Sequence, residues 1–217
     1  KPAEPAIDSL RQRGFPLILC SSKTLAEMVE LAIELDTQAP IVAENGAFIA
    51  IPQSHLLAPH ASGKKTFDTY LIEFTGMARE DILGPAHSLR TEHGFRFEGF
   101  ADWDTEQLAA HTGLSESAAY RAGQRLATEP ILWHDSEARW SEFEASLHQH
   151  GIYSVKGGRF IHLMGDTDKE RGLKTLVSLY QKHQSEFSAF HDQQVSKSQE
   201  SVKLSRISQC KRQHVKM

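Results

Sequence analysis

The stretch LILCSSKT, residues 17–24, decides how the chain folds. Four apolar residues, typical of a strand buried in a sheet, are followed at once by Ser21, Ser22, Lys23 and Thr24. Apolar residues then recur at helical spacing over residues 24–35, and Thr24 with Glu27 forms a capping-box pair. The pattern predicts a strand over 15–20 that leads directly into a helix.

This strand end is a candidate anion site. In an open parallel sheet, ligands bind at the carboxyl ends of strands, beside the start of the following helix. Free backbone N–H groups there favour anions, and the hydroxyls of Ser21 and Ser22 and the charge of Lys23 would add to them. Phosphate is the expected occupant. The alternative, that these hydroxyls only cap the helix, is left open by the spacing.

The composition is that of a globular protein. The 217 residues carry a net charge of −4, with 40% apolar and 24% charged residues. No apolar window is long enough to span a bilayer and no signal peptide is found, so the cytoplasm is the expected compartment. Two distant cysteines provide no disulfide framework. We expect neither a nucleic-acid nor a membrane partner, although residues 195–217 hold six basic residues and one acid.

The order of elements indicates an α/β core. A helix over AIDSLRQRG ends at Gly14, and because the chain starts at Lys1 rather than Met, we expect it to begin inside a fold. The strand, the helix over 24–35 and a second strand, PIVAENGAFIAIP, then predict an α/β layer with a parallel sheet. The second strand is divided by a turn signal at Asn45 and Gly46.

The middle of the chain predicts an inserted α+β domain. Strands are expected at TYLIEF (69–74), FRFEGF, PILW and in a hairpin over IYSVKGGRFIHLMG. Helices are expected over 78–93, in two short pieces broken at Gly113, and over SEARWSEFEASLHQHG. We assign residues 1–76 to the first part of a core, 77–161 to an inserted cap, 162–184 to the second part of the core and 185–217 to a basic tail without folded structure.

Other residues carry possible chemistry. Glu44 and Asn45 follow a predicted core strand and either could face a ligand, although Asn-Gly most often marks a hairpin turn. Lys169 begins the last helix, KERGLKTLVSLYQKH, where a cation is unfavourable because it opposes the helix dipole. It either neutralises a bound phosphate or is simply a solvated lysine. Arg159 in GGRFIH could grip a carboxylate or phosphate, or simply lie on the surface. The twelve histidines have no metal-binding spacing.

Together these fragments resemble a known family. The likeness is carried by the fragments LCSSKT, AENGA, HTGLSESAA, ATEPILW and GGRFIHLMG, with the following GDTDKERGLKTL. Through them the chain is similar, over about residues 5–183, to the haloacid dehalogenase-like phosphatases. Within that superfamily they resemble the mannosyl-3-phosphoglycerate phosphatases, Cof-type enzymes with an α+β cap. The fold implied is a Rossmann-like core, incomplete here, with an inserted α+β cap.

The resemblance implies a reaction. Members of this family are magnesium-dependent phosphoric monoester hydrolases that form an aspartyl-phosphate, with a second aspartate as general acid and base. It implies that Ser21 bonds the phosphoryl group and that Lys169 offsets its charge. In the cap, Arg125, Glu129 and Arg159 are implied contacts for mannose or glycerate. The substrate implied is mannosyl-3-phosphoglycerate, hydrolysed to mannosylglycerate and phosphate in mannosylglycerate biosynthesis.

The sequence also departs from the family pattern. Neither D-x-D-G-T nor G-D-G-x-N-D occurs, so the nucleophile and the magnesium carboxylates are missing, and residues after 184 resemble a frameshifted segment. We therefore expect an inactive chain with no metal ligand of its own, and a core made unstable by the exposed edge of the LILC strand. Two alternatives stay open: a phosphatase of another phosphorylated sugar acid, and a non-catalytic protein that binds sugar phosphates.

Overall fold

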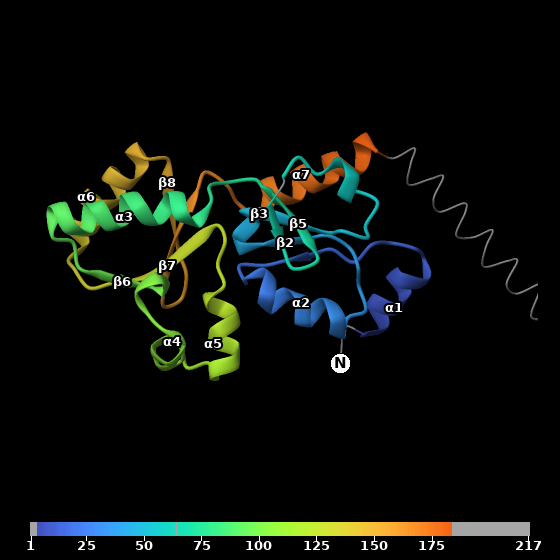
Figure 1. Ribbon diagram of the computed structural model, residues 1–217, viewed down its shortest axis with the longest axis horizontal. Helices are drawn as coiled ribbons and strands as arrows, with labels where there is room; N and C mark the ends of the chain where they lie inside the picture. Colours follow the sequence, from blue (N-terminus) through green and yellow to red (C-terminus); the bar gives the residue numbers. More distant parts are fainter. Residues whose placement is uncertain (1–3, 64, 184–217) are drawn as a thin grey trace, which may run out of the picture. The chain divides into compact units, whose positions relative to one another are not determined.

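The computed structural model describes residues 4–63 and 65–183 (Figure 1). By backbone contacts, residues 1–177 form one compact unit, and Ser178–Met217 form a second, of which only the end of the last helix is described. The predicted basic tail lies outside the described residues. The helices are Glu4–Gln12 (α1), Leu25–Glu34 (α2), Arg79–His93 (α3), Thr105–Thr112 (α4), Glu116–Gly123 (α5), Glu137–Gln149 (α6) and Lys169–Lys182 (α7).

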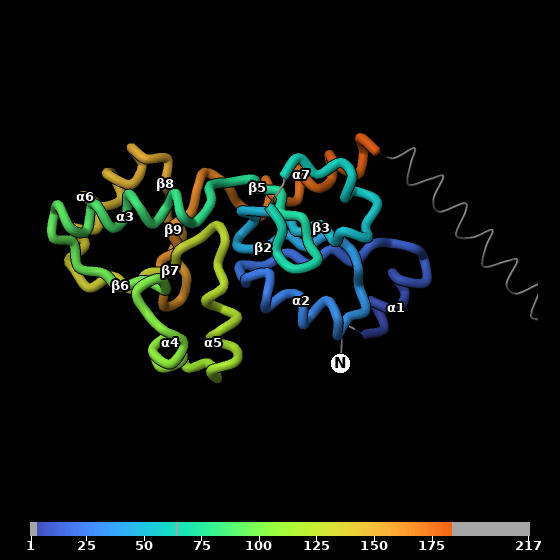
Figure 2. Tube along the Cα trace, viewed as in Figure 1, coloured from blue at the N-terminus to red at the C-terminus, as the bar shows by residue number. Residues whose placement is uncertain are grey.

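Nine strands of the described residues form two sheets, whose chain trace is followed in Figure 2. The first has the order β1-β2-β3-β5-β4 and the second the order β6-β7-β9-β8. The strands are Leu19–Cys20 (β1), Ile41–Ala43 (β2), Phe48–Pro52 (β3), Lys65–Phe67 (β4), Tyr70–Phe74 (β5), Phe97–Gly99 (β6), Thr128–Trp133 (β7), Ile152–Lys156 (β8) and Ile161–Gly165 (β9); short 3-10 turns cover Glu44–Gly46 (η1), Ala58–His60 (η2) and Phe100–Asp102 (η3).

The first sheet is mixed rather than parallel, so this expectation was wrong for most of its strands. Only β1 and β2 pair in parallel, whereas β2–β3, β3–β5 and β4–β5 are antiparallel. The reversal occurs at the turn η1, where Asn45 has φ 61° and Gly46 has φ 91°, in agreement with the Asn-Gly turn signal. The chain therefore returns as a hairpin directly after β2.

The strand predicted over residues 15–20 is reduced to two residues. Its ladder with β2 begins at Leu19, opposite Ile41, while the carbonyl of Leu17 accepts a hydrogen bond from the hydroxyl of Thr37 at 3.0 Å. Within the described residues β1 is an edge strand of its sheet, which is the exposed edge expected from the sequence.

Two helices pack against the first sheet. Leu25, Met28 and Ala32 of α2 form a buried cluster with alternate residues of the strands, among them Ile41 and Ala43. On the opposite face, the first turns of α7 lie against β2, because a Cβ atom at Gly172 would come within 2.8 Å of Val42 Cγ1. The sheet is thus covered on both sides, as its continuous apolar strands require.

The second sheet is antiparallel and has its own core. Helices α3 and α6 bury Ile82, Trp140, Phe143 and other apolar residues against Ile131 and Leu163 of its strands. A smaller cluster, formed by Phe100, Leu108, Ala119 and Ala122, lies under α4 and α5.

The predicted cap, residues 77–161, contains the second sheet except for the end of β9. The predicted end at residue 161 falls on the first residue of β9, whose remaining residues also pair with β8 and β7 up to Gly165. Contacts join all residues of 1–177 into one unit, so the division into core and cap stays a prediction. "Cap" is used below for residues 77–165.

Candidate active site

The residues after β1 are held in a fixed turn. The backbone N–H of Ser21 donates to Val42 O at 3.0 Å, and its carbonyl accepts from Asn45 N at 3.0 Å. Its hydroxyl oxygen accepts a bond from Lys23 N at 3.3 Å. Ser21 is half-buried and directly follows β1. Its hydroxyl therefore lies at the carboxyl end of the strand, where the sequence predicts a ligand.

Helix capping involves Thr24 rather than the two serines. The Thr24 hydroxyl accepts a hydrogen bond from Glu27 N at 3.2 Å and donates to Arg121 O of α5 at 2.8 Å. The Glu27 carboxylate in turn accepts a hydrogen bond from Thr24 N at 2.9 Å, which confirms the capping box. Because Thr24 alone completes the cap, Ser21 and Ser22 are not needed for it.

Lys23 is exposed and forms an ion pair with Glu27 at 2.7 Å, one helical turn away. Burial alone would raise the pKa of Glu27, but the bonds from Lys23 and from Thr24 N outweigh it and lower that pKa. This ion pair on the exposed helix surface accounts for Lys23 without a ligand.

The start of α7 lies directly on the η1 turn. A Cβ atom at Gly46 would collide with the Asp168 carbonyl and lie 2.8 Å from Lys169 Cα. The carbonyl of Gly46 accepts bonds from the hydroxyls of Thr75 and Thr167. Only glycine fits this position, both because of its positive φ and because of the approaching helix.

Through this turn the structure brings Ser21, Asn45 and Lys169 together. Asn45 is bonded to Ser21 on one side, and Gly46 contacts Lys169 on the other. Lys169 is exposed, and its charge acts on Cys20: burial raises the pKa of this thiol, while Lys169 opposes the rise. The charge of Lys169 thus acts on the end of β1, and a ligand shared by Ser21 and Lys169 stays a prediction.

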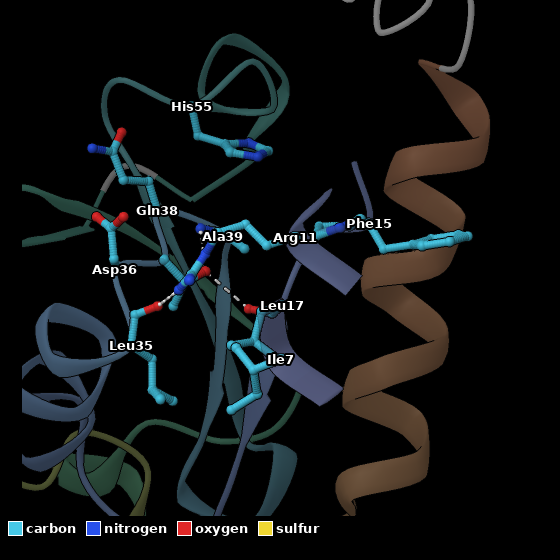
Figure 3. A pocket seen from close by; sticks show the side chains of 11 residues that line it. Ile7, Arg11, Phe15, Leu17, Leu35, Asp36, Gln38, Ala39 and His55 are labelled. Atoms are coloured by element: carbon cyan, nitrogen blue, oxygen red, sulfur yellow. Dashed lines mark hydrogen bonds between the residues drawn. The ribbon is translucent and has the colours of Figure 1, made fainter. Parts of the chain in front are cut away.

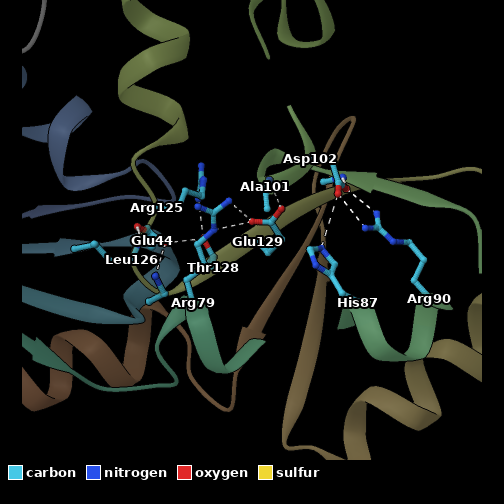
Figure 4. Close-up of polar contacts among 12 residues, drawn as sticks. Glu44, Arg79, His87, Arg90, Ala101, Asp102, Arg125, Leu126, Thr128 and Glu129 are labelled. Atoms are coloured by element: carbon cyan, nitrogen blue, oxygen red, sulfur yellow. Dashed lines mark hydrogen bonds and ion pairs between the residues drawn. The ribbon is translucent and has the colours of Figure 1, made fainter. Parts of the chain in front are cut away.

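A buried acid links this turn to the cap. Glu44, fully buried and with φ 47°, accepts bonds from Leu126 N at 2.8 Å, Ala127 N at 3.0 Å and the Thr128 hydroxyl at 2.8 Å (Figure 4). Sequence reasoning treated Glu44 only as a possible ligand contact. The available signal was a charged residue at the end of an entirely apolar strand.

Arg125 extends the link to the β1 end. Its Nη1 donates to Thr128 Oγ1 at 2.8 Å and to Ser22 O at 3.3 Å, across 103 residues of sequence. Burial lowers the pKa of Arg125, and the carboxylate of Glu44 opposes this shift. Of the predicted cap contacts, Arg125 is the one that reaches the residues following β1.

The other two predicted cap contacts are engaged elsewhere. Glu129 is 1% exposed; it forms an ion pair with Arg79 and accepts a bond from Ala101 N at 2.8 Å (Figure 4). Burial raises the pKa of Glu129, with Arg79 opposing the rise. Arg159 is exposed and donates to the carbonyl of His111 in α4. Their contacts with substrate stay predictions.

The described residues do not provide a magnesium site. Among residues 4–63 and 65–183, no three His, Cys, Asp or Glu side chains are grouped so as to hold a metal ion. Asp166 and Asp168, which precede Lys169 in the sequence, bond Arg171 instead. The donor set therefore does not fit the magnesium that the family resemblance implies.

A separate pocket lies at the other ends of β1 and β2 (Figure 3). It has a volume of about 260 Å³, and Arg11 crosses it to donate to Leu35 O at 2.6 Å. No predicted site residue lines it. Apart from His55, which follows β3, its lining residues lie in the segments that lead into β1 and β2, whereas ligands of such sheets bind after the strands. The lining residues are Ile7, Arg11, Phe15, Pro16, Leu17, Leu35, Asp36, Thr37, Gln38, Ala39 and His55.

The chain is similar in sequence to proteins of known type. A haloacid dehalogenase-like hydrolase family model matches residues 2–82. The glucosyl-3-phosphoglycerate/mannosyl-3-phosphoglycerate phosphatase of Methanococcoides burtonii is 34% identical over 178 residues, which cover 82% of this chain and 65% of that protein. By sequence, the chain is therefore similar to the haloacid dehalogenase-like hydrolases. It spans about two thirds of the length of this curated relative.

Solved structures of haloacid dehalogenase-like proteins share the fold. A phosphatase of this superfamily from Bacteroides thetaiotaomicron has a TM-score of 0.52 and 14% identity, covering 82% of this chain and 64% of that one. A hydrolase of the same type from B. subtilis has a TM-score of 0.50 and 12% identity, covering 81% and 70%. The α/β core with an α+β cap, inferred from the sequence, is thereby confirmed. None of the described helices is long and apolar enough to cross a membrane.

Proposed function

We propose that this chain recognises mannosyl-3-phosphoglycerate and is a part of a phosphatase that hydrolyses it to mannosylglycerate and phosphate in the cytoplasm. The observation that carries the proposal is the common turn at Asn45 and Gly46, against which both Ser21 and Lys169 are placed. The name of the Methanococcoides burtonii relative supports the substrate class.

The proposed roles follow from position and charge. The Ser21 hydroxyl donates a hydrogen bond to a phosphoryl oxygen at the end of β1, and the Lys169 ammonium neutralises the phosphoryl charge. Both groups are held before the substrate arrives, because Ser21 is bonded to β2 and η1 and Lys169 begins a helix seated on the same turn. Arg125 reaches this position from the cap through Ser22 O.

Hydrolysis needs groups that these residues do not supply. The 217-residue sequence contains no D-x-D-G-T, and the described acids do not form a magnesium site. We therefore propose that the chain as given binds its substrate without turning it over, and we derive no step through magnesium. The non-catalytic alternative, a protein that only binds sugar phosphates, is favoured by the same missing motif.

Binding and turnover are tested separately. Isothermal titration of the 217-residue chain with mannosyl-3-phosphoglycerate should show binding, weakened about tenfold or more by Ser21→Ala or Lys169→Met. Lys156→Met, which removes an exposed lysine of the cap, is the matched control and should leave the affinity unchanged. Unaltered binding in the first two variants would refute the proposed phosphate site.

Phosphate release with added magnesium decides between the remaining alternatives. We expect none from the chain as given. A panel that includes glucosyl-3-phosphoglycerate, the second substrate in the relative's name, tests whether another phosphorylated sugar acid binds more tightly. Turnover of any member by the chain alone would contradict the proposed dependence on the missing aspartate.

A further inference from the structure

Two buried nitrogen atoms of the cap have no hydrogen-bond partner within the described residues. They are Arg125 Nε and His162 Nδ1. A third buried nitrogen without a hydrogen bond, Arg79 Nη2, has the Glu129 carboxylate at 2.5 Å and is thus paired as an ion. A buried polar group left without a partner costs about 1–3 kcal/mol, so two in one region require an explanation.

Both residues belong to the same side of the cap sheet. Arg125 bonds Thr128, the first residue of β7, and His162 on β9 pairs with Pro130 of β7. Because side chains alternate along strands, Thr128, Pro130 and His162 share one face. The neighbouring residues Ile131 and Leu163 face the other way, into the core under α3 and α6.

The guanidinium of Arg125 is fixed in place. Its Nη1 is shared between Thr128 Oγ1 and Ser22 O, and its Cζ lies 5.5 Å from the centre of the Phe100 ring. The unused Nε is therefore a donor of known position, tied to the residue that follows Ser21. Burial, with a smaller contribution from the positive charge of Arg125, lowers the pKa of His162 to about 4, so the imidazole is neutral at pH 7.

The chemistry of these two groups identifies a ligand class. A fixed guanidinium N–H and a neutral imidazole lie on the same face, near enough for the charge of Arg125 to act on His162. Together they suit a carboxylate, with the imidazole as a second, uncharged donor to the same group. In a phosphoglycerate unit the carboxylate and the phosphate are separated by only two carbon atoms, so the two groups must bind at neighbouring positions. The contact of Arg125 with Ser22 provides this proximity.

We infer that Arg125 Nε and His162 Nδ1 form a subsite for the carboxylate of the glycerate moiety, beside the phosphate position at Ser21. This inference rests on the proposed function for the phosphate position only. His162 was not among the residues singled out from the sequence, because it lies in an ordinary alternating strand. Its role is to select an acid over the corresponding alcohol, not to take part in phosphoryl transfer.

The test compares ligands with and without the carboxylate. The 217-residue chain is titrated with inorganic phosphate, glycerol 3-phosphate and 3-phospho-D-glycerate. We expect 3-phospho-D-glycerate to bind about tenfold to a hundredfold more tightly than glycerol 3-phosphate, the range for a hydrogen bond to a charged group. His162→Phe should reduce this ratio towards one while the affinity for inorganic phosphate is retained, and Arg125→Lys should also reduce the ratio.

Control variants separate the subsite from general effects on charge and folding. His134→Phe and Arg96→Met remove an exposed histidine and an exposed arginine of the cap and should keep the wild-type ratio. Arg125→Lys retains the positive charge next to Ser22, and circular dichroism checks that each variant is folded.

The outcomes distinguish the two proposals. If phosphate binds but the wild-type ratio is near one, the subsite is refuted and the phosphate position stands. If inorganic phosphate does not bind, the proposed function fails. In that case binding of D-glycerate alone, detected by NMR and lost in His162→Phe, supports the subsite, and no binding of D-glycerate overturns it.

Discussion

Replacing Glu44 by alanine tests the link between the η1 turn and the cap. The carboxylate of Glu44 is fully buried and accepts three hydrogen bonds, from Leu126 N, Ala127 N and the Thr128 hydroxyl. Alanine removes all three acceptor contacts and leaves the donors buried. Water can reach these donors in place of the lost carboxylate only if the contact between the turn and the cap opens.

The expected loss of stability follows from these contacts. Hydrogen bonds to a charged group contribute about 1.5–3 kcal/mol each, but bonds to one carboxylate are not additive. Breaking a buried charged network typically costs about 3–5 kcal/mol, and we expect Glu44→Ala to lower the free energy of unfolding by this amount. Glu30→Ala is the matched control, since Glu30 pairs with Arg121 across the same two regions with its side chain 60% exposed, and should cost at most about 1 kcal/mol.

Two measurements follow the change. Urea unfolding, monitored by circular dichroism, gives the free energy of unfolding. Hydrogen exchange by NMR reports the amides of Leu126 and Ala127 directly, and their protection should fall by about a hundredfold or more in Glu44→Ala. If Glu44→Ala unfolds within about 1 kcal/mol of the parent and both amides keep their protection, Glu44 does not hold the cap and the argument is wrong.

Four further changes test other parts of the structure. Gly46→Ala should cost more than about 2 kcal/mol in urea unfolding, because φ is 91° and the new methyl group meets the start of α7, whereas Gly84→Ala, with open space in α3, should stabilise by about 0.5–1 kcal/mol. Arg79→Met should cost about 3–5 kcal/mol by leaving Glu129 buried without its cation; a loss below about 1 kcal/mol would contradict a buried ion pair, and Glu129→Met in the same chain should recover part of the loss. The pKa of His162 is about 4 in the folded chain against about 6.5 when unfolded, so the unfolded state gains the proton first and stability should fall as the pH drops from about 6.5 to 4; an equal slope in His162→Phe would exclude this source. Finally, amides of the first sheet should exchange faster than those of the cap sheet, because β1 is an edge strand in the described residues, and a single cooperative melt with a protected first sheet would refute the predicted instability.

Local signals predicted the elements well. The helix after β1 begins where the Thr24 capping box places it, and α5 begins after Ser115, whose side chain caps it. These features depend on residues three or four positions apart, so a single sequence contains all the information they need. The break at Gly113 is of the same kind, because its φ of 76° ends α4.

Features that depend on distant residues were not predictable in this way. The apolar runs of β2 and β3 do not by themselves show that the two strands pair antiparallel, and the local Asn-Gly turn signal was the only indication of the hairpin. Glu44 lies next to a turn, where an acid is usually exposed, and its burial follows only from three donors more than 80 residues away. The contact between Arg125 and Ser22 O spans 103 residues and appears only in the fold.

The close approach of α7 to β2 and η1 leaves no room for a side chain at position 172. A Cβ atom there would lie 2.8 Å from Val42 Cγ1 and 2.9 Å from both Cα and O of Gly46. Because the Gly46 contacts are with backbone, a smaller residue at position 42 should not make room for a larger one at position 172. Glycine at position 172 in related sequences would mark where the last helix is seated.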